Sequence, residues 1–211
     1  HVGTRDRFYL EYSDIPLNMI NAIIAAEDKT FFEHQGFDIK GIANAFIINI
    51  RNIFKKTDSN YVGASTITQQ LVKNILLNND QTISRKLKEL ILSLRIERSY
   101  SKKFILELYL NEIYFGRRSY GIASAANNYF NKSIFDLELN EFAYLAALPK
   151  GPNNYDPKKN YKRALDRRNY VLKQMLSNKF ITLDEFETEV NKEIIVSIRD
   201  NRKYQLDYKT D

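Results

Sequence analysis

Residues 17–148 contain no proline, and this uninterrupted stretch is the feature that most constrains the fold of the chain. Proline breaks a helix because it lacks a backbone N–H and clashes with the preceding turn. Apolar residues in this stretch recur every three or four positions, which is the period of a helix with one buried face. The remaining prolines except Pro16 lie together in the segment PKGPNNYDP. The sequence therefore predicts a mainly α fold.

Apolar periodicity and capping residues indicate where the helices lie. The first should follow Asp14, with Pro16 in its first turn. Others are expected over residues 39–54, 63–77, 84–98, 101–115, 121–130, 138–148 and 161–179, before a further acidic helix. Gly116 has the position of a C′ glycine. Apolar residues on two sides of the 84–98 helix predict that it is central and buried. Residues 1–190 are expected to form one domain, and the β-branched segment 191–211 reads as a strand-like tail or a linker.

Composition excludes several kinds of site. The 211 residues include no cysteine, which rules out disulfides, a thiolate nucleophile and a Cys-based zinc site. There are 32 Lys and Arg against 26 Asp and Glu, and this excess of positive charge suits an anionic partner or simply solubility. No window approaches the length of apolar sequence that spans a membrane. Because the chain begins with His1, we expect a mature or excised piece whose anchor lay upstream.

Glu27 lies on the apolar stripe of the first expected helix, together with Ile20, Ile23, Ile24 and Phe31. A carboxylate at such a position either lines a cleft or turns to solvent at the helix end. In a cleft, loss of hydration would raise its pKa and make it a candidate general acid or base.

The segment Gly63–Asn74, GASTITQQLVKN, combines a helix start with anion-binding groups. The spacing of Thr66 and Gln69 fits a capping box. Thr66, Gln69, Gln70 and Lys73 would share one face, where backbone amides and an ammonium group suit an anion. The alternative is an ordinary capped helix.

The segment Arg85–Glu89, RKLKE, places Arg85 and Glu89 one helical turn apart. Charges on a buried helix need partners or a polar cleft, and the alternative is an exposed salt-bridged patch. Two carboxylates, Glu27 and Glu89, and a basic platform of Lys73 and Arg85 suit a reaction at an acetal carbon that carries a phosphate.

Several strings resemble those of the peptidoglycan glycosyltransferases, glycosyltransferase family 51. EDKTFFEHQGFD at Glu27–Asp38 resembles the E-D-x-x-F-x-x-H-x-G motif of that family. GASTITQQ resembles its G-G-S-T-I-T-Q-Q motif, with Ala64 as a mild departure. RKLKE and KKFILELYLNEIYFG resemble the third and fourth motifs, and GIASAANNYF and EFAYLAALPKGPNNYDP resemble the segments that follow. The motifs occur in the order of the family, over roughly residues 14–175.

The resemblance implies a lysozyme-like helical lobe with a smaller membrane-associated jaw, here about residues 39–62. Residues 50–61 are longer and more basic than in the shortest members of the family. It also implies an enzyme that polymerises lipid II into β-1,4 glycan strands by inversion. The 4-hydroxyl of the acceptor N-acetylglucosamine attacks C1 of the donor N-acetylmuramyl unit and releases undecaprenyl pyrophosphate.

The resemblance also assigns roles to residues. Glu27 matches the general base, and Glu89 matches a second essential carboxylate that positions the donor pyrophosphate. Lys73 and Arg85 match residues that hold this pyrophosphate. Asp28 and His34 are expected to be structural supports, as is Glu107 in the fourth motif. The remaining residues expected in the donor site are Ser65, Thr66, Gln69, Gln70 and Lys86.

The implied ligands and partners are lipid II, the nascent glycan strand, the membrane surface, moenomycin-like phosphoglycolipid inhibitors and other cell-wall synthesis proteins. Nucleic acid is not expected. The resemblance admits a divalent cation, Mg²⁺ or Mn²⁺, bound with the donor pyrophosphate, and it implies no organic cofactor. The expected location is the extracytoplasmic face of a bacterial cytoplasmic membrane. The helix over 39–54, rich in isoleucine and followed by Lys55 and Lys56, is expected to lie at that surface, with poor order in residues 54–61.

Alternatives remain open at this level. A lytic muramidase would use a carboxylic acid in a similar lobe but would need no cationic platform. A non-catalytic anion-binding module would show salt-dependent binding to nucleic acid or acidic lipid. Within the family, the segment ALDRRNYVLKQM favours a class A penicillin-binding protein, which adds a transpeptidase, over a monofunctional enzyme.

Overall fold

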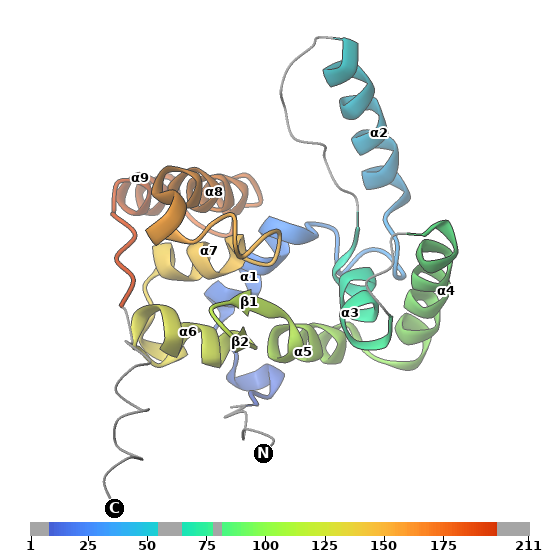
Figure 1. Cartoon of the computed structure of the whole chain (residues 1–211), viewed down its shortest axis with the longest axis horizontal. Helices are drawn as coiled ribbons and strands as arrows, with labels where there is room; N and C mark the ends of the chain where they lie inside the picture. Colours follow the sequence, from blue (N-terminus) through green and yellow to red (C-terminus); the bar gives the residue numbers. More distant parts are fainter. Residues whose placement is uncertain (1–8, 55–64, 78–81, 198–211) are drawn as a thin grey trace, which may run out of the picture.

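The computed structural model describes residues 9–54, 65–77 and 82–197, and this part of the chain is mainly α, as the sequence predicts. Figure 1 shows the arrangement of the elements. In chain order they are η1 (Tyr12–Asp14), α1 (Leu17–Glu27), α2 (Ile39–Phe54), α3 (Ile67–Leu76), α4 (Ile83–Ser99), α5 (Lys102–Glu112), β1 (Tyr114–Gly116), β2 (Ser119–Tyr120), α6 (Ile122–Phe130), η2 (Ile134–Asp136), α7 (Leu139–Ala147), α8 (Pro157–Ser177) and α9 (Leu183–Val190).

The main core lies where α1, α7 and α8 pack against one another. Helices α1 and α7 are apolar enough to be covered on several sides, and α7 is buried from Asn140 to Ala147. Met19 and Ile23 of α1 and Leu145 of α7 are fully buried. Because α1 runs through this core and ends at Glu27, its last residue is held on a rigid element.

A second group of helices is formed by α3, α4 and α5, with α3 in contact with both of the others. Within the described residues, α4 buries only Glu89 and Ser93. The prediction of a buried central helix was therefore wrong. Since α4 packs on one side only, its apolar residues Ile83, Leu87 and Ile91 stay exposed, Ile83 to 91 %.

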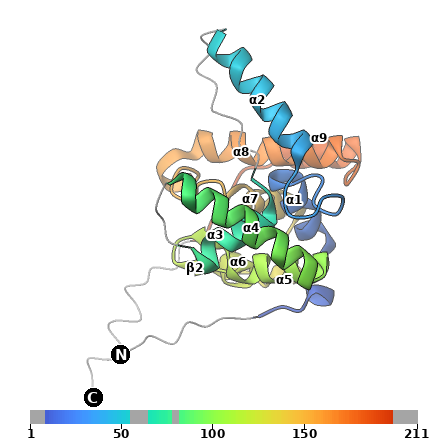
Figure 2. The ribbon, with the colours of Figure 1, turned by 90° about the vertical axis from the view of Figure 1, so that its right-hand side faces the viewer.

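Helix α2 matches the expected range of 39–54 and projects away from the other helices (Figures 1 and 2). Ile42, Ile47 and Ile48 are exposed on it, as is Ile39 at its start. The jaw expected over residues 39–62 is therefore described only up to residue 54. The prediction of poor order in residues 54–61 falls, from residue 55 on, outside the described residues. In the part of the chain that the structure describes, no helix is both long and apolar enough to cross a bilayer.

Several helix ends differ from the sequence prediction, among them those of α1 and α5. Helix α1 stops at Glu27, so Phe31 lies in the turn that follows, although it is still fully buried. Ser101 caps α5 as expected, but this helix ends at Glu112, and Tyr114–Gly116 pairs with β2 in a short hairpin. Gly116, at φ +90°, is therefore part of the hairpin and is not a C′ glycine.

The segment after α9 is neither helix nor strand over residues 193–197. Ile194 is buried there, and the Ser197 hydroxyl donates to the backbone carbonyl of Phe130 at 3.1 Å. The strand expected in this tail is thus not observed up to residue 197, because these residues contact the end of α6 and the core rather than a partner strand. Residues 198–211 lie outside the described part.

Candidate active site

Glu27, a predicted catalytic residue, is the last residue of α1. Its side chain is only 9 % exposed. Burial raises the pKa of the Glu27 carboxyl, while the Gln70 amide and the cations of Arg167 and Lys150 oppose this rise. A carboxylate in this environment is a stronger base than one in water and still has donors that stabilise its ionised form.

Gln70 on α3 holds one oxygen of this carboxylate. Its Nε2 donates to Glu27 Oε2 at 2.9 Å. The other end of the same amide, Oε1, accepts a hydrogen bond from the hydroxyl of Tyr109 on α5 at 3.0 Å. The predicted site residue Gln70 therefore contacts the candidate base directly and joins it to a buried tyrosine.

Two cations that were not predicted as site residues, both in the C-terminal part of the chain, face Glu27. Arg167 on α8 lies with NH2 at 3.4 Å from Glu27 Oε1, and its guanidinium stacks over the ring of Tyr170. Lys150, between α7 and α8, has its pKa lowered by burial and by the charge of Arg167, while Glu27 opposes that shift. Helices α1, α3, α5 and α8 therefore meet at this carboxylate.

Asp28 occupies the N-terminus of α3. Its Oδ2 accepts a hydrogen bond from the backbone N–H of Ile67 at 3.0 Å, and both of its oxygens contact His34 Nε2, at 2.9 and 3.0 Å. A carboxylate of the protein thus takes the place that a helix N-terminus offers to a bound anion. These contacts agree with the supporting role expected for Asp28 and His34.

Thr66 and Gln69 form the predicted capping box at the start of α3. The Thr66 hydroxyl also donates to the carbonyl of Gly36 at 2.8 Å, and both side chains are buried. Gly36, at φ +95°, lies so close to α4 that a Cβ there would be 3.1 Å from the backbone of Ser93. The expectation of free amides on this helix end was therefore wrong, because capping and Asp28 satisfy the N–H groups of Thr66, Ile67 and Gln69.

A second charged cluster surrounds Glu89 on α4. This carboxylate is 3 % exposed, and its oxygens contact Arg85 NH1 at 3.0 Å and the Lys86 ammonium. Lys86 also donates to the Ser65 hydroxyl at 3.1 Å. The structure thus brings together Ser65, Arg85, Lys86 and Glu89, four of the predicted site residues. The alternative of an exposed salt-bridged patch agrees with the ion pairs and the exposed Lys86, but it does not fit a carboxylate buried to this extent.

Lys73 differs from these cations. It is exposed and, among the described residues, has no ion pair. Lys73 lies three residues after Gln70, so the two side chains share one face of α3. Gln70 is the residue on this face that contacts Glu27. Lys73 therefore presents an exposed positive charge one helical turn after Gln70.

A divalent cation is not accommodated by these groups as they stand. The described residues contain no set of three carboxylate, histidine or cysteine side chains that could hold a metal. Mg²⁺ can bind through one carboxylate together with substrate phosphates. At Glu89, however, both oxygens already have cationic partners, which a metal ion would have to displace. The contacts on Glu89 therefore do not fit a resident cation.

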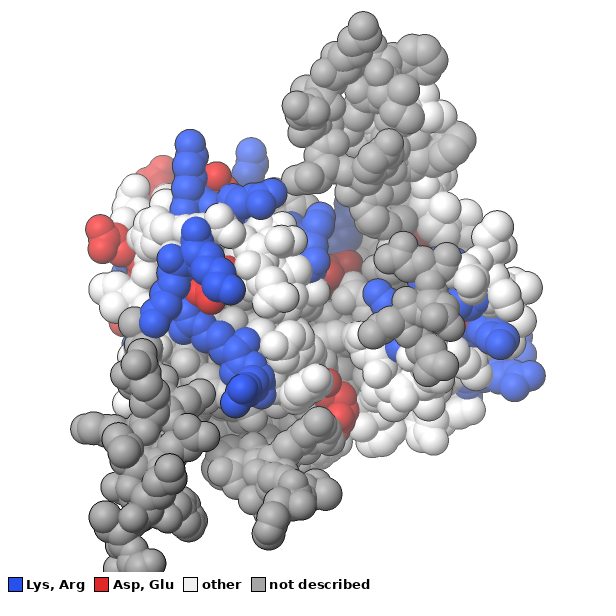
Figure 3. Space-filling view, viewed as in Figure 1, with Lys and Arg blue, Asp and Glu red and all other residues white. Residues whose placement is uncertain are grey.

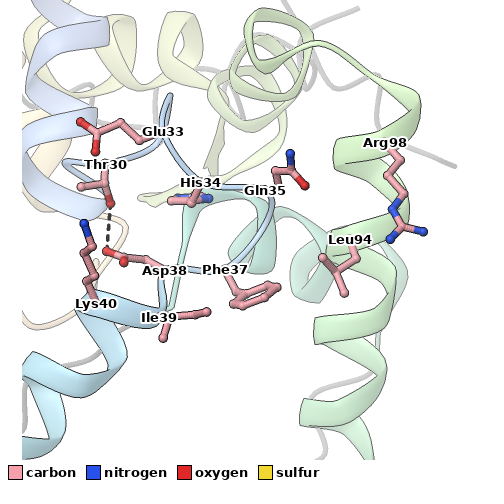
Figure 4. A pocket seen from close by; sticks show the side chains of 10 residues that line it. All are labelled: Thr30, Glu33, His34, Gln35, Phe37, Asp38, Ile39, Lys40, Leu94 and Arg98. Atoms are coloured by element: carbon pink, nitrogen blue, oxygen red, sulfur yellow. Dashed lines mark hydrogen bonds between the residues drawn. The ribbon is translucent and has the colours of Figure 1, made fainter.

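The surface of the molecule is hollowed between two groups of helices (Figure 3). Figure 3 shows the hollow between the part that carries α7 and α8 and the part that carries α3 and α4, with acidic atoms at its base and basic side chains at its edges. A separate pocket of about 580 Å³ lies between the segment that follows α1, the start of α2 and α4, and Figure 4 shows Phe37 and Leu94 among its lining residues. The predicted catalytic and donor residues do not line this pocket.

Comparisons with known proteins identify the family of the chain. A model of the family described as Transglycosylase matches residues 1–176. Penicillin-binding protein 1A of Rickettsia typhi is 46 % identical over 193 residues, which are 92 % of this chain and 24 % of that protein. Penicillin-binding protein 1A of Aquifex aeolicus is 45 % identical over 203 residues, 96 % of this chain and 27 % of that protein.

A solved structure shares the fold. The 2.6 Å crystal structure of penicillin-binding protein 1A from Haemophilus influenzae superposes with a TM-score of 0.53 at 25 % identity, covering 96 % of this chain and 20 % of that one. The chain spans about a quarter of the length of the curated relatives it matches. The chain therefore belongs to the transglycosylase family, and it is a peptidoglycan glycosyltransferase domain of the kind found in penicillin-binding proteins 1A.

Sequence reasoning missed three residues that contact or face Glu27, namely Tyr109, Lys150 and Arg167. Each lies in a segment whose resemblance was noted without a role for the residue. A usable signal existed at Arg167 and Arg168, because two adjacent arginines interrupt the apolar stripe of α8. Arg168 is fully buried and donates to the carbonyls of Val190 and Lys192, which is a structural role.

Proposed function

We propose that this domain polymerises lipid II, with Glu27 as the general base. The acceptor 4-hydroxyl attacks C1 of the donor sugar and forms the new C1–O bond. The bond from C1 to the pyrophosphate oxygen breaks with both electrons going to the leaving group, and Glu27 takes the hydroxyl proton. Attack opposite the leaving group inverts the configuration at C1. The observation that carries this proposal is the buried Glu27 carboxylate, held by Gln70 and Arg167.

The environment of Glu27 suits proton transfer. A base is most effective when its pKa lies near the working pH, because it is then both deprotonated and basic. Burial raises the pKa of Glu27 toward that range, while the Gln70 amide and the cations of Arg167 and Lys150 preserve the ionised form. These opposing effects favour a group that accepts a proton and releases it again in each cycle.

The leaving pyrophosphate is assigned to the cations of α3 and α4. Lys73 is free among the described residues to bind phosphate oxygens, and Lys86 and Arg85 lie on α4 around Glu89. Cations that face the negative charge developing on a leaving group stabilise the transition state more than the ground state. Glu89 fixes the direction of both α4 cations, which supports its expected role in positioning the donor. Ser65 adds a hydroxyl at this cluster.

The lipid substrate places the domain at a membrane surface. Helix α2 projects from the other helices and exposes Ile42, Ile47 and Ile48, and Arg51 lies in its last turn. An apolar helix with basic residues at one end can lie in the interfacial region of an anionic bilayer. We assign this surface to the extracytoplasmic face of a bacterial cytoplasmic membrane, where a longer protein of the penicillin-binding class would act with other cell-wall synthesis proteins.

The base assignment is tested by Glu27→Gln. This variant keeps the shape of the side chain and its contact with Gln70 but cannot take a proton. We expect polymerisation of labelled lipid II, followed on gels, to fall by about 10²–10⁴. Glu33→Gln, which removes an exposed carboxylate from the following segment, is the matched control and should polymerise normally. A Glu27→Gln variant that keeps more than about a tenth of the wild-type rate contradicts the assignment.

A further inference from the structure

Glu27 accepts its closest hydrogen bond from an amide whose direction Glu27 determines only while it is ionised. A glutamine side chain has a donor end and an acceptor end that are almost the same size. If the Gln70 amide turned over, its oxygen would face the Glu27 carboxylate and repel it. That repulsion is lost when Glu27 is protonated, so a second contact is needed to hold Gln70 with Nε2 toward Glu27 Oε2, at the observed 2.9 Å, in both protonation states.

Tyr109 supplies that contact. Its hydroxyl donates to Gln70 Oε1 at 3.0 Å, and its side chain is fully buried at the interface of α5 with α3. Burial, together with the nearby charges of Glu27 and Asp28, raises the pKa of the Tyr109 hydroxyl well above its usual value. The hydroxyl therefore keeps its proton throughout the working range of pH and remains a donor.

We propose that Tyr109 is a positioning residue for Glu27, because its hydroxyl fixes the Gln70 amide in the orientation that donates to the carboxylate. The inference rests on the proposed role of Glu27 as a base. Tyr109 touches no reacting atom and acts through Gln70. The chain of hydrogen bonds runs from α5 through α3 to the end of α1, so three helices set the direction in which the base presents its free electron pair.

The proposal predicts a particular effect of pH. Without the Tyr109 hydroxyl, the Gln70 amide can turn over, and its oxygen then accepts a hydrogen bond from a protonated Glu27. The protonated form of Glu27 gains a partner that it lacks in the wild type, so the pKa of Glu27 rises. The other charged or titratable groups facing Glu27 are Asp28, Lys150 and Arg167, and they are unchanged.

The experiment compares Tyr109→Phe with Tyr129→Phe. Both variants remove one hydroxyl from a fully buried tyrosine, and the Tyr129 hydroxyl donates instead to the carbonyl of Phe115 at 2.9 Å. Polymerisation of labelled lipid II is measured from acid to alkaline pH. For Tyr109→Phe we expect a loss of about two- to tenfold on the acid side, the range for one hydrogen bond, and little loss at alkaline pH. Tyr129→Phe should leave the shape of the profile unchanged.

A second measurement does not depend on activity. In the ¹⁵N-labelled chain, the Gln70 side-chain amide signal, identified by its loss in Gln70→Leu, should titrate with Glu27 and should stop titrating in Glu27→Gln. Its midpoint should lie at higher pH in Tyr109→Phe than in wild type or Tyr129→Phe. An unchanged midpoint in Tyr109→Phe overturns the positioning role, even if Glu27→Gln is inactive. A moved midpoint together with an active Glu27→Gln variant supports the hydrogen-bond chain and contradicts the base assignment.

Discussion

At the scale of single residues, Glu27 experiences two opposing effects. Burial removes the carboxyl from water and raises its pKa, and this is the largest single effect on it. Arg167 and Lys150 work in the other direction, because a nearby positive charge favours the ionised carboxylate. The pKa of the candidate base thus depends in part on residues more than a hundred positions away in the sequence.

Removing one of these charges should move the pH dependence of polymerisation. In Arg167→Gln the ionised form of Glu27 loses its cation, so the pKa of Glu27 rises and the acid limb of kcat/KM moves to higher pH. We expect a loss of about tenfold on the acid side and a smaller loss at alkaline pH, as for the loss of a charged hydrogen-bond partner. A pH series of initial rates with labelled lipid II measures this.

The control for this series is Arg163→Gln. It removes an exposed arginine from the same helix, one turn before Arg167. Equal losses in both variants at every pH would mean that α8 contributes only a general positive field, and the specific pairing with Glu27 would then be rejected.

At the scale of elements, α3 serves two parts of the site. Its N-terminus is closed by its own capping box and by Asp28, so it cannot offer free N–H groups from Thr66, Ile67 or Gln69 to a phosphate. Further along α3, the side chain of Gln70 contacts Glu27, and the side chain of Lys73 is exposed and can meet an anion. The proposed binding of the pyrophosphate therefore relies on side-chain cations rather than on these backbone N–H groups.

Removing cations from α3 and α4 should weaken donor binding. Lys73→Ala and Arg85→Ala should each reduce the affinity for a moenomycin-like phosphoglycolipid by about 1.5–3 kcal/mol, the range for hydrogen bonds to charged groups. Calorimetry measures this, with Lys103→Ala as the control, since Lys103 is exposed on α5 over the ring of Tyr12. Unchanged affinity in both site variants would rule out these helices as the pyrophosphate platform.

At the scale of the whole molecule, the helical lobe and α2 differ in how their apolar residues are used. The lobe buries its apolar residues between α1, α7 and α8, whereas α2 extends outward with several isoleucines exposed (Figure 2). Exposed apolar surface of this kind marks an interaction site, and the lipid tail of the proposed substrate makes a membrane the fitting partner.

Polar substitutions on α2 should separate membrane binding from folding. Ile47→Ser with Ile48→Ser removes two apolar side chains that are exposed in the protein, so thermal stability should change little. Binding to phosphatidylglycerol vesicles should fall about tenfold or more, because these side chains no longer bury apolar area in the membrane. Co-sedimentation with vesicles measures the binding. Phe135→Ser with Leu183→Ser, which alters exposed residues outside α2, is the control. Unfolding of the α2 variant with normal vesicle binding would show that these residues are part of the core.

The sequence by itself determined the helices and most of the chemical groups. Absence of proline over residues 17–148 and apolar periodicity placed the helices, including α2 to the residue, because helix formation depends mainly on local pattern and capping. Glu27 was identifiable because a carboxylate interrupts an apolar stripe. The motif strings indicated the family, which the comparisons confirm.

The tertiary structure decided which residues act together. Tyr109 and Arg167 reach Glu27 through contacts that span the sequence, and no local pattern specifies which helix faces which. The same reason explains the error on α4, whose two apolar sides predicted burial although only one side is covered by the fold. Periodicity describes the faces of one helix, whereas the charge, burial and direction of Glu27 depend on how four helices meet.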